Sequence, residues 1–511
     1  MVFTLLSALL LILSFPKFSL WPLAWFSCVP VFYALRREKT FGGAFLHFYV
    51  FGFLFFLASV EWLRHVSYFG WMFVATAYSF YFGFFGLAVH WFWQRKRFLL
   101  SLFILPSLWC VLEWVRAEIP VWGFGWNLLA YSQAFNPTIA GIGNLIGAYG
   151  LSWLIVFANL AIFFVLDFEL NHKKSEGVIA LVGIVSLALI FGVYFTYELN
   201  RPPLSSQSDQ AGRLRAAVIQ GNIPQEQKWD RNYKLRIIDT YEKLSSLIAG
   251  KNQDRSDVII WPEAAYPGFF NVDSDQKRIL TLARELETPI LLGGLHYERI
   301  DSDRGRYFNS AYLILPRNNE ENRYDKVRLV SFGEYVPWRK FFGLIGLERF
   351  AYSLGVSDFE AGTQVKIFSL DEQKKFSVLI CFEDTFPYLA RRAVSDGARF
   401  LVVITNDAWF SKSAAPEQHL QASIFRAIEN GVPLIRAANT GISAVITSQG
   451  TVLERVQDPL GNDTFIAGGI SAPVSLTSGK TFYQTKGYLI PYFCLIFVAG
   501  GFILGRQAKN D

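Results

Sequence analysis

The first 197 residues are a series of long apolar segments separated by short basic clusters. A helix needs roughly 20 residues to cross the ~30 Å hydrocarbon core of a bilayer, so apolar segments near this length predict membrane-spanning helices. Seven such segments lie at 2–15, 19–35, 43–63, 70–93, 98–115, 137–168 and 177–197, the first two being short, and an eighth lies at 487–505. The opening segment lacks the basic start and the cleavage site of a secretory signal, so we interpret it as the first helix. We expect an α-helical polytopic membrane domain with eight spans.

The composition divides the chain into parts of different character. Of its 511 residues, 52% are hydrophobic and only 18% are charged, whereas soluble domains average ~45–50% and ~25%. The apolar excess lies at the two ends of the chain, and the region between them has an ordinary soluble composition. We predict a seven-span membrane domain at 1–200, a polar linker at 201–212, a soluble domain at 213–485, and a last helix with a tail at 486–511.

The distribution of basic residues predicts the orientation, because short cytoplasmic loops are enriched in Lys and Arg. With a cytoplasmic N-terminus, the cytoplasmic loops carry Arg36, Arg37, Lys39, Arg95, Lys96, Arg97, Lys173, Lys174, Arg506 and Lys509, whereas the opposite short loops carry only Lys17, Arg64 and Arg116. Both termini are therefore expected in the cytoplasm and the soluble domain on the outer face. These clusters account for much of the +6 net charge, and no basic stripe indicates binding to nucleic acid.

Two intramembrane features have alternative interpretations. Glu113 and Arg116 lie three residues apart near the outer end of a predicted helix, where they would form a local ion pair or contact a lipid headgroup. Gly143 and Gly147 have GxxxG spacing, which is typical of close helix packing and alternatively of a surface for lipid entry.

The soluble region alternates strand-like and helix-like segments, which predicts an α/β layered domain. The expected strands lie in 214–221, 257–263, 289–297, 309–317, 376–384, 399–407, 433–439 and 441–450, and the expected helices at 231–249, 275–287, after Pro387 and at 416–430. Ligands in such folds gather at the carboxyl ends of strands. Three predicted strands end in reactive or polar side chains, namely Glu263, Cys381, and Asn406 with Asp407.

Cys381 is a candidate nucleophile because it stands between a predicted strand and a helix start, where unpaired N–H groups favour a thiolate. It is the only cysteine outside the predicted spans, since Cys28, Cys110 and Cys494 lie within them. A thiol of pKa ~8.5 needs a base and a nearby cation to react near neutral pH. Glu263 is available as the base and a lysine as the cation. The alternative is that Cys381 is an inert buried side chain.

Three stretches in this order carry a family resemblance: WPE with Glu263, YDKVRLVSFGEYVP with Lys326, and LICFED with Cys381. Taken alone, Lys326 would be interpreted as a solvated surface lysine. Together the stretches resemble the nitrilase superfamily, which implies a Glu-Lys-Cys triad on an α-β-β-α sandwich. With spans before and after this domain, the chain resembles the membrane-embedded apolipoprotein N-acyltransferases over nearly its whole length. Further similar stretches are QGNIPQEQKWD, SFGEYVPWR, NDAWF, FRAIENG and RAANTG.

The resemblance implies a role for each matching residue. Cys381 would be the nucleophile, Glu263 the general base, and Lys326 the cation that stabilises the tetrahedral oxyanion. Glu334, eight residues after Lys326, would keep that lysine charged and oriented. The family usually has Tyr where this chain has Phe382, which removes one hydroxyl beside the nucleophile.

Further positions match the family outside the triad. Trp229 and Glu383 would line the acyl or acceptor site, although Trp229 could also be an interfacial anchor and Glu383 a helix cap. Aromatic side chains at Phe342, Phe350 and Tyr352 are expected to dip toward lipid and to protect a thioester from water.

The implied reaction transfers an acyl chain from a phospholipid, through a thioester on Cys381, to the α-amine of diacylglyceryl-cysteine in an apolipoprotein at the bacterial inner membrane. The sequence contains neither HExxH nor CxxC, so no metal and no cofactor are expected. Two other classes remain open: a membrane-tethered amide or nitrile hydrolase with the same triad, and a transporter or scaffold whose outer domain only binds.

Overall fold

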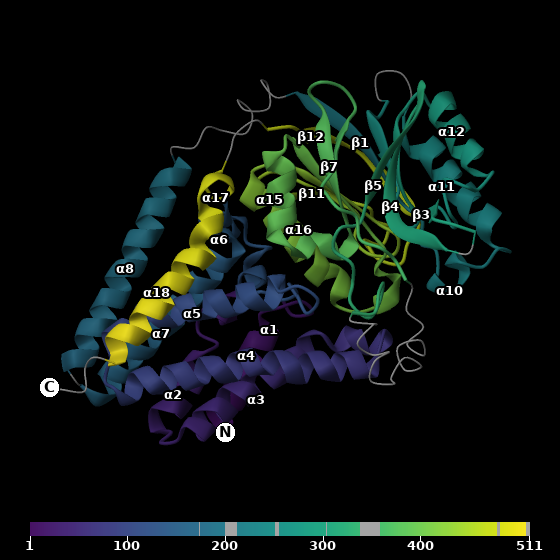
Figure 1. Cartoon of the computed structure of the whole chain (residues 1–511). Helices are drawn as coiled ribbons and strands as arrows, with labels where there is room; N and C mark the ends of the chain where they lie inside the picture. The colour runs from purple at the N-terminus through teal and green to yellow at the C-terminus, as the bar shows by residue number, and fades with distance from the viewer. Residues whose placement is uncertain are drawn as a thin grey trace.

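The computed structural model describes residues 1–172, 174–199, 212–250, 255–302, 304–337, 358–477 and 481–506. The N-terminal part is a helical bundle, joined by the last helix of the chain, and the region between them forms two β-sheets with helices on their outer faces (Figure 1).

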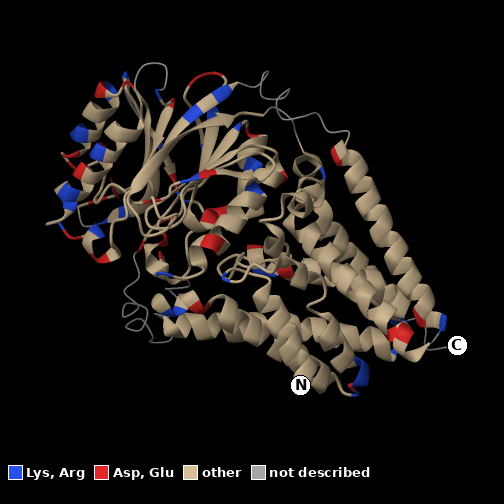
Figure 2. Ribbon diagram, turned by 180° about the vertical axis from the view of Figure 1, so that it is seen from behind, with Lys and Arg blue, Asp and Glu red and all other residues tan. Residues whose placement is uncertain are grey.

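Six helices in the described part of the chain are long and apolar enough to cross a membrane. They are α3 (Phe41–Ser59), α4 (Tyr68–Gln94), α5 (Phe98–Glu118), α7 (Gly143–Asn171), α8 (Lys174–Leu199) and the segment Gly487–Arg506, whose α-helical part is α18 (Ile490–Arg506). Charged residues gather on the sheet domain and near the ends of these helices, whose middle parts are largely uncharged (Figure 2). This pattern fits helices that cross an apolar layer.

The first two predicted spans differ from the observed elements. The first is a helix of only 12 residues, α1 (Val2–Leu13). The second prediction, one helix over 19–35, is wrong: a 3-10 turn, η1 (Trp21–Trp25), is followed by the nine-residue helix α2 (Val29–Arg37). Nine residues at 1.5 Å each extend only ~14 Å. The eight predicted spans are therefore not confirmed, and six are supported.

A buried asparagine holds the break between η1 and α2. Asn159 of α7 donates from Nδ2 to the Ala24 carbonyl at 2.9 Å and accepts the Cys28 N–H on Oδ1 at 2.8 Å. Backbone groups without partners are costly inside a bilayer, and side chains of neighbouring helices can satisfy them. The interruption of the helix is thus stabilised by a residue more than 130 positions away in the chain.

Several helix ends with basic residues meet at one end of the bundle. Arg36 of α2 pairs with Asp167 near the end of α7, at 3.5 Å, and with Glu176 in the first turn of α8. Gly505 near the end of α18 packs against Trp91 near the end of α4. This end of the bundle lies away from the sheets (Figure 1). Of the basic residues predicted to lie there, Lys173 and Lys509 fall outside the described residues.

Each sheet of the soluble region has six strands. The first sheet has the order β12-β1-β2-β3-β4-β5, with β1 (Arg213–Gln220), β2 (Val258–Ile260), β3 (Ile290–Arg299), β4 (Gly305–Leu315), β5 (Asn318–Asp325) and β12 (Gly468–Ser475). The second has the order β11-β10-β9-β8-β7-β6, with β6 (Ile367–Ser369), β7 (Lys375–Ile380), β8 (Phe400–Thr405), β9 (Leu434–Ala438), β10 (Ala444–Ile446) and β11 (Val452–Arg455). In each sheet three consecutive strands, β1-β2-β3 and β7-β8-β9, are parallel.

The sheets pack face to face around a core that includes Val218, Val378 and Ile404, all fully buried. Helices α11 (Lys234–Ile248) and α12 (Gln276–Glu285) cover the first sheet, and α15 (Pro387–Ser395) and α16 (Ala415–Asn430) cover the second (Figure 1). This is the predicted α-β-β-α sandwich. The sequence analysis missed the strands β5, β6, β11 and β12. The strand β5, at the edge of the first sheet, has the polar sequence NNEENRYD without apolar alternation.

The outer face of α16 packs on the membrane domain, so all its residues except Glu417 are buried. Gln418 on this helix accepts the indole N–H groups of Trp62 and Trp126, each at 2.9 Å, and donates to the Ser59 carbonyl at 2.7 Å. Buried polar groups with partners on both sides specify one relative position. The sandwich is therefore seated on the helical bundle in a defined orientation.

The intramembrane pair holds a loop rather than forming the predicted ion pair. Arg116 donates to the carbonyls of Phe124 and Trp126 at 2.8 and 2.9 Å, and Glu113 accepts the Leu129 N–H at 2.8 Å. Both side chains are buried, at 3% and 7% exposed, so neither is placed to contact a headgroup. They attach the segment after α5 to that helix.

The predicted GxxxG pair does serve close packing, although the elements it contacts are not other membrane spans. A Cβ on Gly143 would lie 3.3 Å from Ile428 of α16. Gly147 adopts φ +67° at a kink within α7, and a Cβ there would lie 2.4 Å from Tyr483. Only glycine readily takes this conformation and this approach.

Candidate active site

Cys381 stands at the sharp turn that follows the parallel strand β7. Its backbone has φ +53°, in the left-handed region, and it begins the 3-10 turn η5 (Cys381–Thr385). A non-glycine residue in this region carries a cost of ~1–3 kcal/mol and often marks a functional position. The side chain keeps part of its surface accessible, whereas the other three cysteines are buried. The predicted strand end is therefore observed, with a short 3-10 turn between it and the next helix, α15.

Glu383 fastens this turn to the segment that follows β5. Its carboxylate accepts the N–H groups of Ile380, Val327 and Arg328 at 2.7, 2.7 and 3.0 Å, and the Tyr324 hydroxyl at 2.9 Å. Burial raises its pKa to about 7 against the effect of these hydrogen bonds. Glu383 is fully buried, and its predicted place beside the acyl or acceptor site stays a prediction. Its bond to Ile380 does cap η5, but the carboxylate also joins two separate parts of the site.

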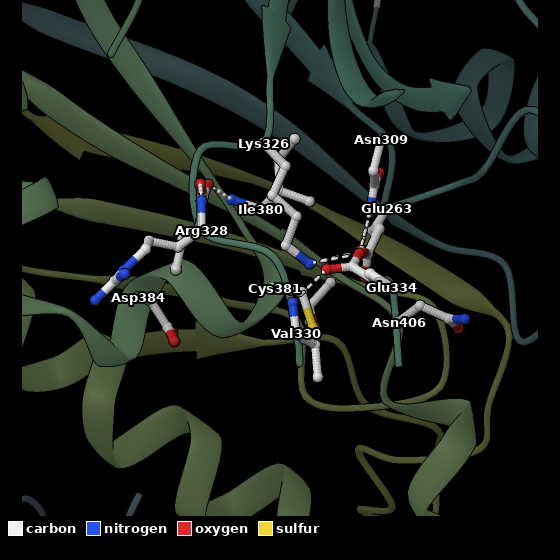
Figure 3. A network of polar contacts seen from close by, with 12 residues as sticks. Glu263, Asn309, Lys326, Arg328, Val330, Glu334, Ile380, Cys381, Asp384 and Asn406 are labelled. Carbon is white, nitrogen blue, oxygen red and sulfur yellow. Dashed lines mark hydrogen bonds and ion pairs between the residues drawn. The ribbon is translucent and has the colours of Figure 1, made fainter. Parts of the chain in front are cut away.

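Lys326 directly follows β5 and points into a cluster of carboxylates (Figure 3). Its Nζ lies 2.8 Å from Glu334 Oε1 and 3.6 Å from Glu263 Oε1. Asn309 of β4 donates to the same two oxygens, at 2.9 and 2.8 Å. The predicted surface alternative for Lys326 is wrong, since the residue is 1% exposed. Burial opposes its charge, but Glu334 and Glu263 outweigh burial and raise the pKa of Lys326 above its usual range.

The structure brings the four predicted residues of this cluster together. Figure 3 shows the Cys381 sulfur beside the Lys326 ammonium and the carboxylates of Glu263 and Glu334. Burial and the Glu263 charge raise the pKa of the Cys381 thiol, and the Lys326 charge lowers it only partly. These surroundings therefore favour the neutral thiol, whose reaction as a nucleophile requires removal of the proton by a base. The Glu263 carboxylate lies close enough for its charge to act on this thiol.

The loop between Lys326 and Glu334 rests on the membrane domain. Arg328 donates to the carbonyl of Glu118, the last residue of α5, at 2.9 Å. Ser331 donates to the Val121 carbonyl at 2.5 Å. The second oxygen of Glu334 accepts the Val330 N–H of this loop at 2.8 Å. The cluster around Lys326 is thus connected, within one short loop, to the end of a membrane helix.

A network of four fully buried charged residues lies behind the nucleophile turn. His419 of α16 contacts Asp384 at 2.9 Å and Asp407 at 3.0 Å, and Arg436 of β9 contacts the same two residues at 3.2 and 3.1 Å. Burial and Arg436 oppose the charge on His419, but the two aspartates outweigh them and raise its pKa to about 9. Since Asp384 belongs to η5, the network holds the turn against α16. The sequence analysis did not predict Asp384 or His419 in this role.

Two further predicted positions, Trp229 and Asn406, lie at the short helix α10 (Gln225–Lys228). Trp229 is 47% exposed and follows this helix. Asn406 lies after β8 and donates to Gln225 at 2.9 Å. The predicted aromatic residues Phe342, Phe350 and Tyr352 lie outside the described residues.

Two residues near the cluster were missed by the sequence analysis. They are Asn309, which binds both carboxylates, and Lys228, whose Nζ donates to the Glu263 carbonyl at 3.1 Å. Lys228 stands in the QEQKWD stretch next to Trp229. That position was the only signal available for it.

Comparison with known proteins shows the class to which the soluble domain belongs. Residues 215–468 match the family model described as carbon-nitrogen hydrolase, so the sandwich belongs to the nitrilase superfamily. Residues 7–161 match the model described as the apolipoprotein N-acyltransferase N-terminal domain.

Curated relatives match both parts at once. Apolipoprotein N-acyltransferase of Geobacter metallireducens is 35% identical over 98% of this chain and 94% of its own length. The enzyme of the same name from Haemophilus influenzae is 31% identical over 96% of this chain and 91% of its own length. This chain belongs to the apolipoprotein N-acyltransferase family, and it is a multi-pass membrane protein. Among solved structures, a double mutant of the amidase from Nesterenkonia sp. AN1 in complex with acrylamide aligns with a TM-score of 0.37 at 19% identity, covering 54% of this chain and 94% of that chain.

Proposed function

We propose that this protein transfers an acyl chain from a phospholipid, through a thioester on Cys381, to the α-amine of diacylglyceryl-cysteine in an apolipoprotein. The observation that carries this proposal is the loop from Lys326 to Glu334, which belongs to the reactive cluster and is anchored on the end of α5 through Arg328. A reactive site built against the end of a membrane helix is suited to a lipid ester. The family membership supports the same conclusion.

In the first half-reaction, Glu263 takes the proton of the Cys381 thiol while the sulfur attacks the ester carbonyl of the phospholipid. The carbonyl oxygen becomes an oxyanion, which the Lys326 ammonium stabilises. The C–O bond of the ester then breaks, Glu263 returns the proton to the departing alkoxide, and a lysophospholipid leaves. Cys381 remains as the thioester.

In the second half-reaction, the α-amine of the acceptor attacks the thioester carbonyl and Glu263 takes a proton from the nitrogen. Lys326 again stabilises the oxyanion, the C–S bond breaks, and the sulfur recovers the proton as the amide is released. Glu334 and Asn309 keep Lys326 and Glu263 in position in both steps, and Glu383 holds the Cys381 turn. Because Trp229 is exposed and its neighbour Lys228 contacts Glu263, we assign Trp229 to the surface that an incoming chain contacts.

The proposal includes the orientation in the membrane. The basic helix ends gather at the end of the bundle opposite the sandwich, and such residues favour the cytoplasm. We therefore place this end and both termini in the cytoplasm of a bacterial inner membrane, with the domain 213–485 in the periplasm between the helical domain 1–200 and the last helix. Protease added to sealed spheroplasts should cleave the 213–485 domain and spare the loop around Lys96. Cleavage at that loop from outside would contradict this orientation.

The reaction is tested by incubating the full-length protein with a phospholipid that carries a radiolabelled acyl chain. Label should become attached to Cys381 as a hydroxylamine-sensitive thioester and should move to the amine of a diacylated lipopeptide. Cys381→Ala should take up no label, and Cys381→Ser should not form product, because an oxyester is a poorer acyl donor. Release of the label as free fatty acid at the same rate with and without the lipopeptide would indicate a hydrolase and would contradict the proposal.

A further inference from the structure

Lys228 is a fully buried cation next to the reactive cluster of Glu263, Lys326, Glu334 and Cys381. The proposed reaction gives it no role. It ends the short helix α10 and is 0% exposed. Its Nζ donates to the main-chain carbonyl of Glu263 at 3.1 Å. Among the described residues no carboxylate lies within ion-pair distance of this ammonium, in contrast to Lys326, which contacts two. Burying an ammonium without a paired carboxylate is costly, so its place in this site needs an explanation.

The main chain that Lys228 contacts is unusual. Ala264, the residue after Glu263, has φ +47°, in the left-handed region. A Cβ on Gly293 of β3 would lie 2.6 Å from the Ala264 nitrogen, so the turn with Glu263 packs directly on the strand backbone. The Lys228 ammonium is therefore bound to a strained turn that presents the carboxylate of Glu263 to the site.

Charge gives a second reason for its position. The carboxylates of Glu263 and Glu334 outnumber the one ammonium of Lys326. The total charge of the site does not change when the thiol proton moves from Cys381 to Glu263. It also does not change when the thiolate adds to the carbonyl and the oxyanion forms. A second ammonium brings the site close to neutrality in each of these states. The titratable groups whose charges act on Lys228 are Glu263 and Cys381, so the lysine is near enough for them to influence one another.

We propose that Lys228 is a positioning residue with a second positive charge for the active site: it holds the main chain of Glu263 and favours the thiolate and the oxyanion over their neutral forms. This inference rests on the proposed function for its catalytic meaning. The electrostatic effect on Cys381 can be measured without any acyl transfer, so the two proposals can fail separately.

The charge of Lys228 depends on pH within an accessible range. Burial lowers its pKa to about 8, and the nearby Glu263 and Cys381 limit the decrease. The ammonium is thus present below about pH 8 and is lost above it. An arginine at the same position would stay charged at every pH in this range.

The test measures the rate at which iodoacetamide alkylates Cys381 in the full-length protein in detergent, by mass spectrometry of the Cys381 peptide, from pH 6.5 to 9.5. Three variants separate charge from hydrogen bonding. Lys228→Met removes both, Lys228→Gln keeps a donor for the Glu263 carbonyl but not the charge, and Lys228→Arg keeps both. The exposed Lys243 of α11 gives the matched control, Lys243→Met.

At pH 7 we expect Lys228→Met and Lys228→Gln to react about tenfold more slowly than the wild type, because loss of a nearby opposite charge shifts a thiol by on the order of one pKa unit. Lys228→Arg should remain within about threefold. Above pH 8 the wild type should lose its advantage over Lys228→Met, and Lys228→Arg should become the faster protein. Lys243→Met should match the wild type throughout.

Equal rates for Lys228→Met and the wild type at pH 7 would overturn the inference. So would a Lys228→Gln variant that reacts like the wild type, because only the hydrogen bond would then matter. Cys28 and Cys110 are buried, so their resistance to alkylation verifies that each variant is folded. If the electrostatic effect is observed but no label is transferred from phospholipid, the proposed function fails and the assignment of Lys228 to Cys381 stands.

Discussion

Replacement of Glu334 is the most informative change in the site, because this residue is expected to act only through Lys326. Its Oε1 accepts from Lys326 Nζ at 2.8 Å and from Asn309 Nδ2 at 2.9 Å. Its Oε2 accepts the Val330 N–H at 2.8 Å. Glu334→Ala removes all three bonds, whereas Glu334→Gln retains one acceptor oxygen and loses the charge.

The distances set the scale of the effect. With an effective dielectric constant of ~20, a unit charge at 2.8 Å contributes ~6 kcal/mol of gross attraction to Lys326, and Glu263 at 3.6 Å contributes ~5 kcal/mol. Glu263 alone can therefore keep Lys326 charged, but it would draw the ammonium toward the base. Loss of a charged oxyanion partner costs ~10² to 10³ in rate, so we expect that loss for Lys326→Ala. For Glu334→Ala we expect a loss of about tenfold, and less for Glu334→Gln.

The assay measures thioester formation and product release separately in Glu334→Ala, Lys326→Ala and the double variant. Residues that act as one unit give non-additive losses, so the double variant should be no more than about threefold slower than Lys326→Ala. Thermal unfolding of each variant controls for loss of the fold. Fully additive losses would mean that Glu334 acts independently of Lys326, for example on the acceptor amine, and would refute the reasoning.

Three further predictions follow from other parts of the molecule. The pKa of His419 is about 9 in the folded state and ~6.5 in the unfolded state. The free energy of unfolding should therefore fall as pH rises between these values, by up to ~1.4 kcal/mol per pH unit. A His419→Gln variant whose free energy of unfolding, measured by denaturation, falls equally with pH would contradict this. Asn159→Ala should lower the free energy of unfolding in detergent by ~1–3 kcal/mol, because backbone groups at the break before α2 lose their partners; a lower melting temperature would report this loss. Replacing the exposed Asn171 should have little effect. Gly293→Ala should displace the Glu263 turn and reduce acyl transfer at least tenfold without unfolding the protein, because its Cβ would lie 2.6 Å from the Ala264 nitrogen; unchanged activity would show that the turn can move.

Much of the fold was predictable because it depends on short-range pattern. The long apolar segments predicted α3, α4, α5, α7, α8 and α18, since crossing an apolar layer imposes a length that is visible in sequence. Alternating segments predicted the main strands and helices of the sandwich. The polar strand β5 and the interrupted segment before α2 were not predictable in this way. One is specified by pairing with β4 and the other by hydrogen bonds from Asn159, so neither has a local signature.

The candidate site also has a part that the sequence predicted and a part that only the structure shows. The order of Glu263, Lys326 and Cys381 along the chain, with their flanking motifs, was sufficient to select these residues. Their spacing in sequence could not reveal that Glu383 is buried and joins the Cys381 turn to the segment after β5. Nor could it reveal that Lys228, 35 residues before Glu263, carries a hydrogen bond to its main chain.

The sequence by itself therefore determined the kind of protein, which is a membrane-embedded member of the nitrilase superfamily with a cysteine nucleophile among its expected residues. Only the tertiary structure decided which groups surround that cysteine, how the sandwich is seated on the bundle through α16, and which buried charges face one another. The physical reason is the separation along the chain between the residues that interact. Helix length and strand alternation are set by neighbours in the chain, whereas burial, the pKa of a side chain and the position of a reactive turn depend on contacts between segments that only folding brings together.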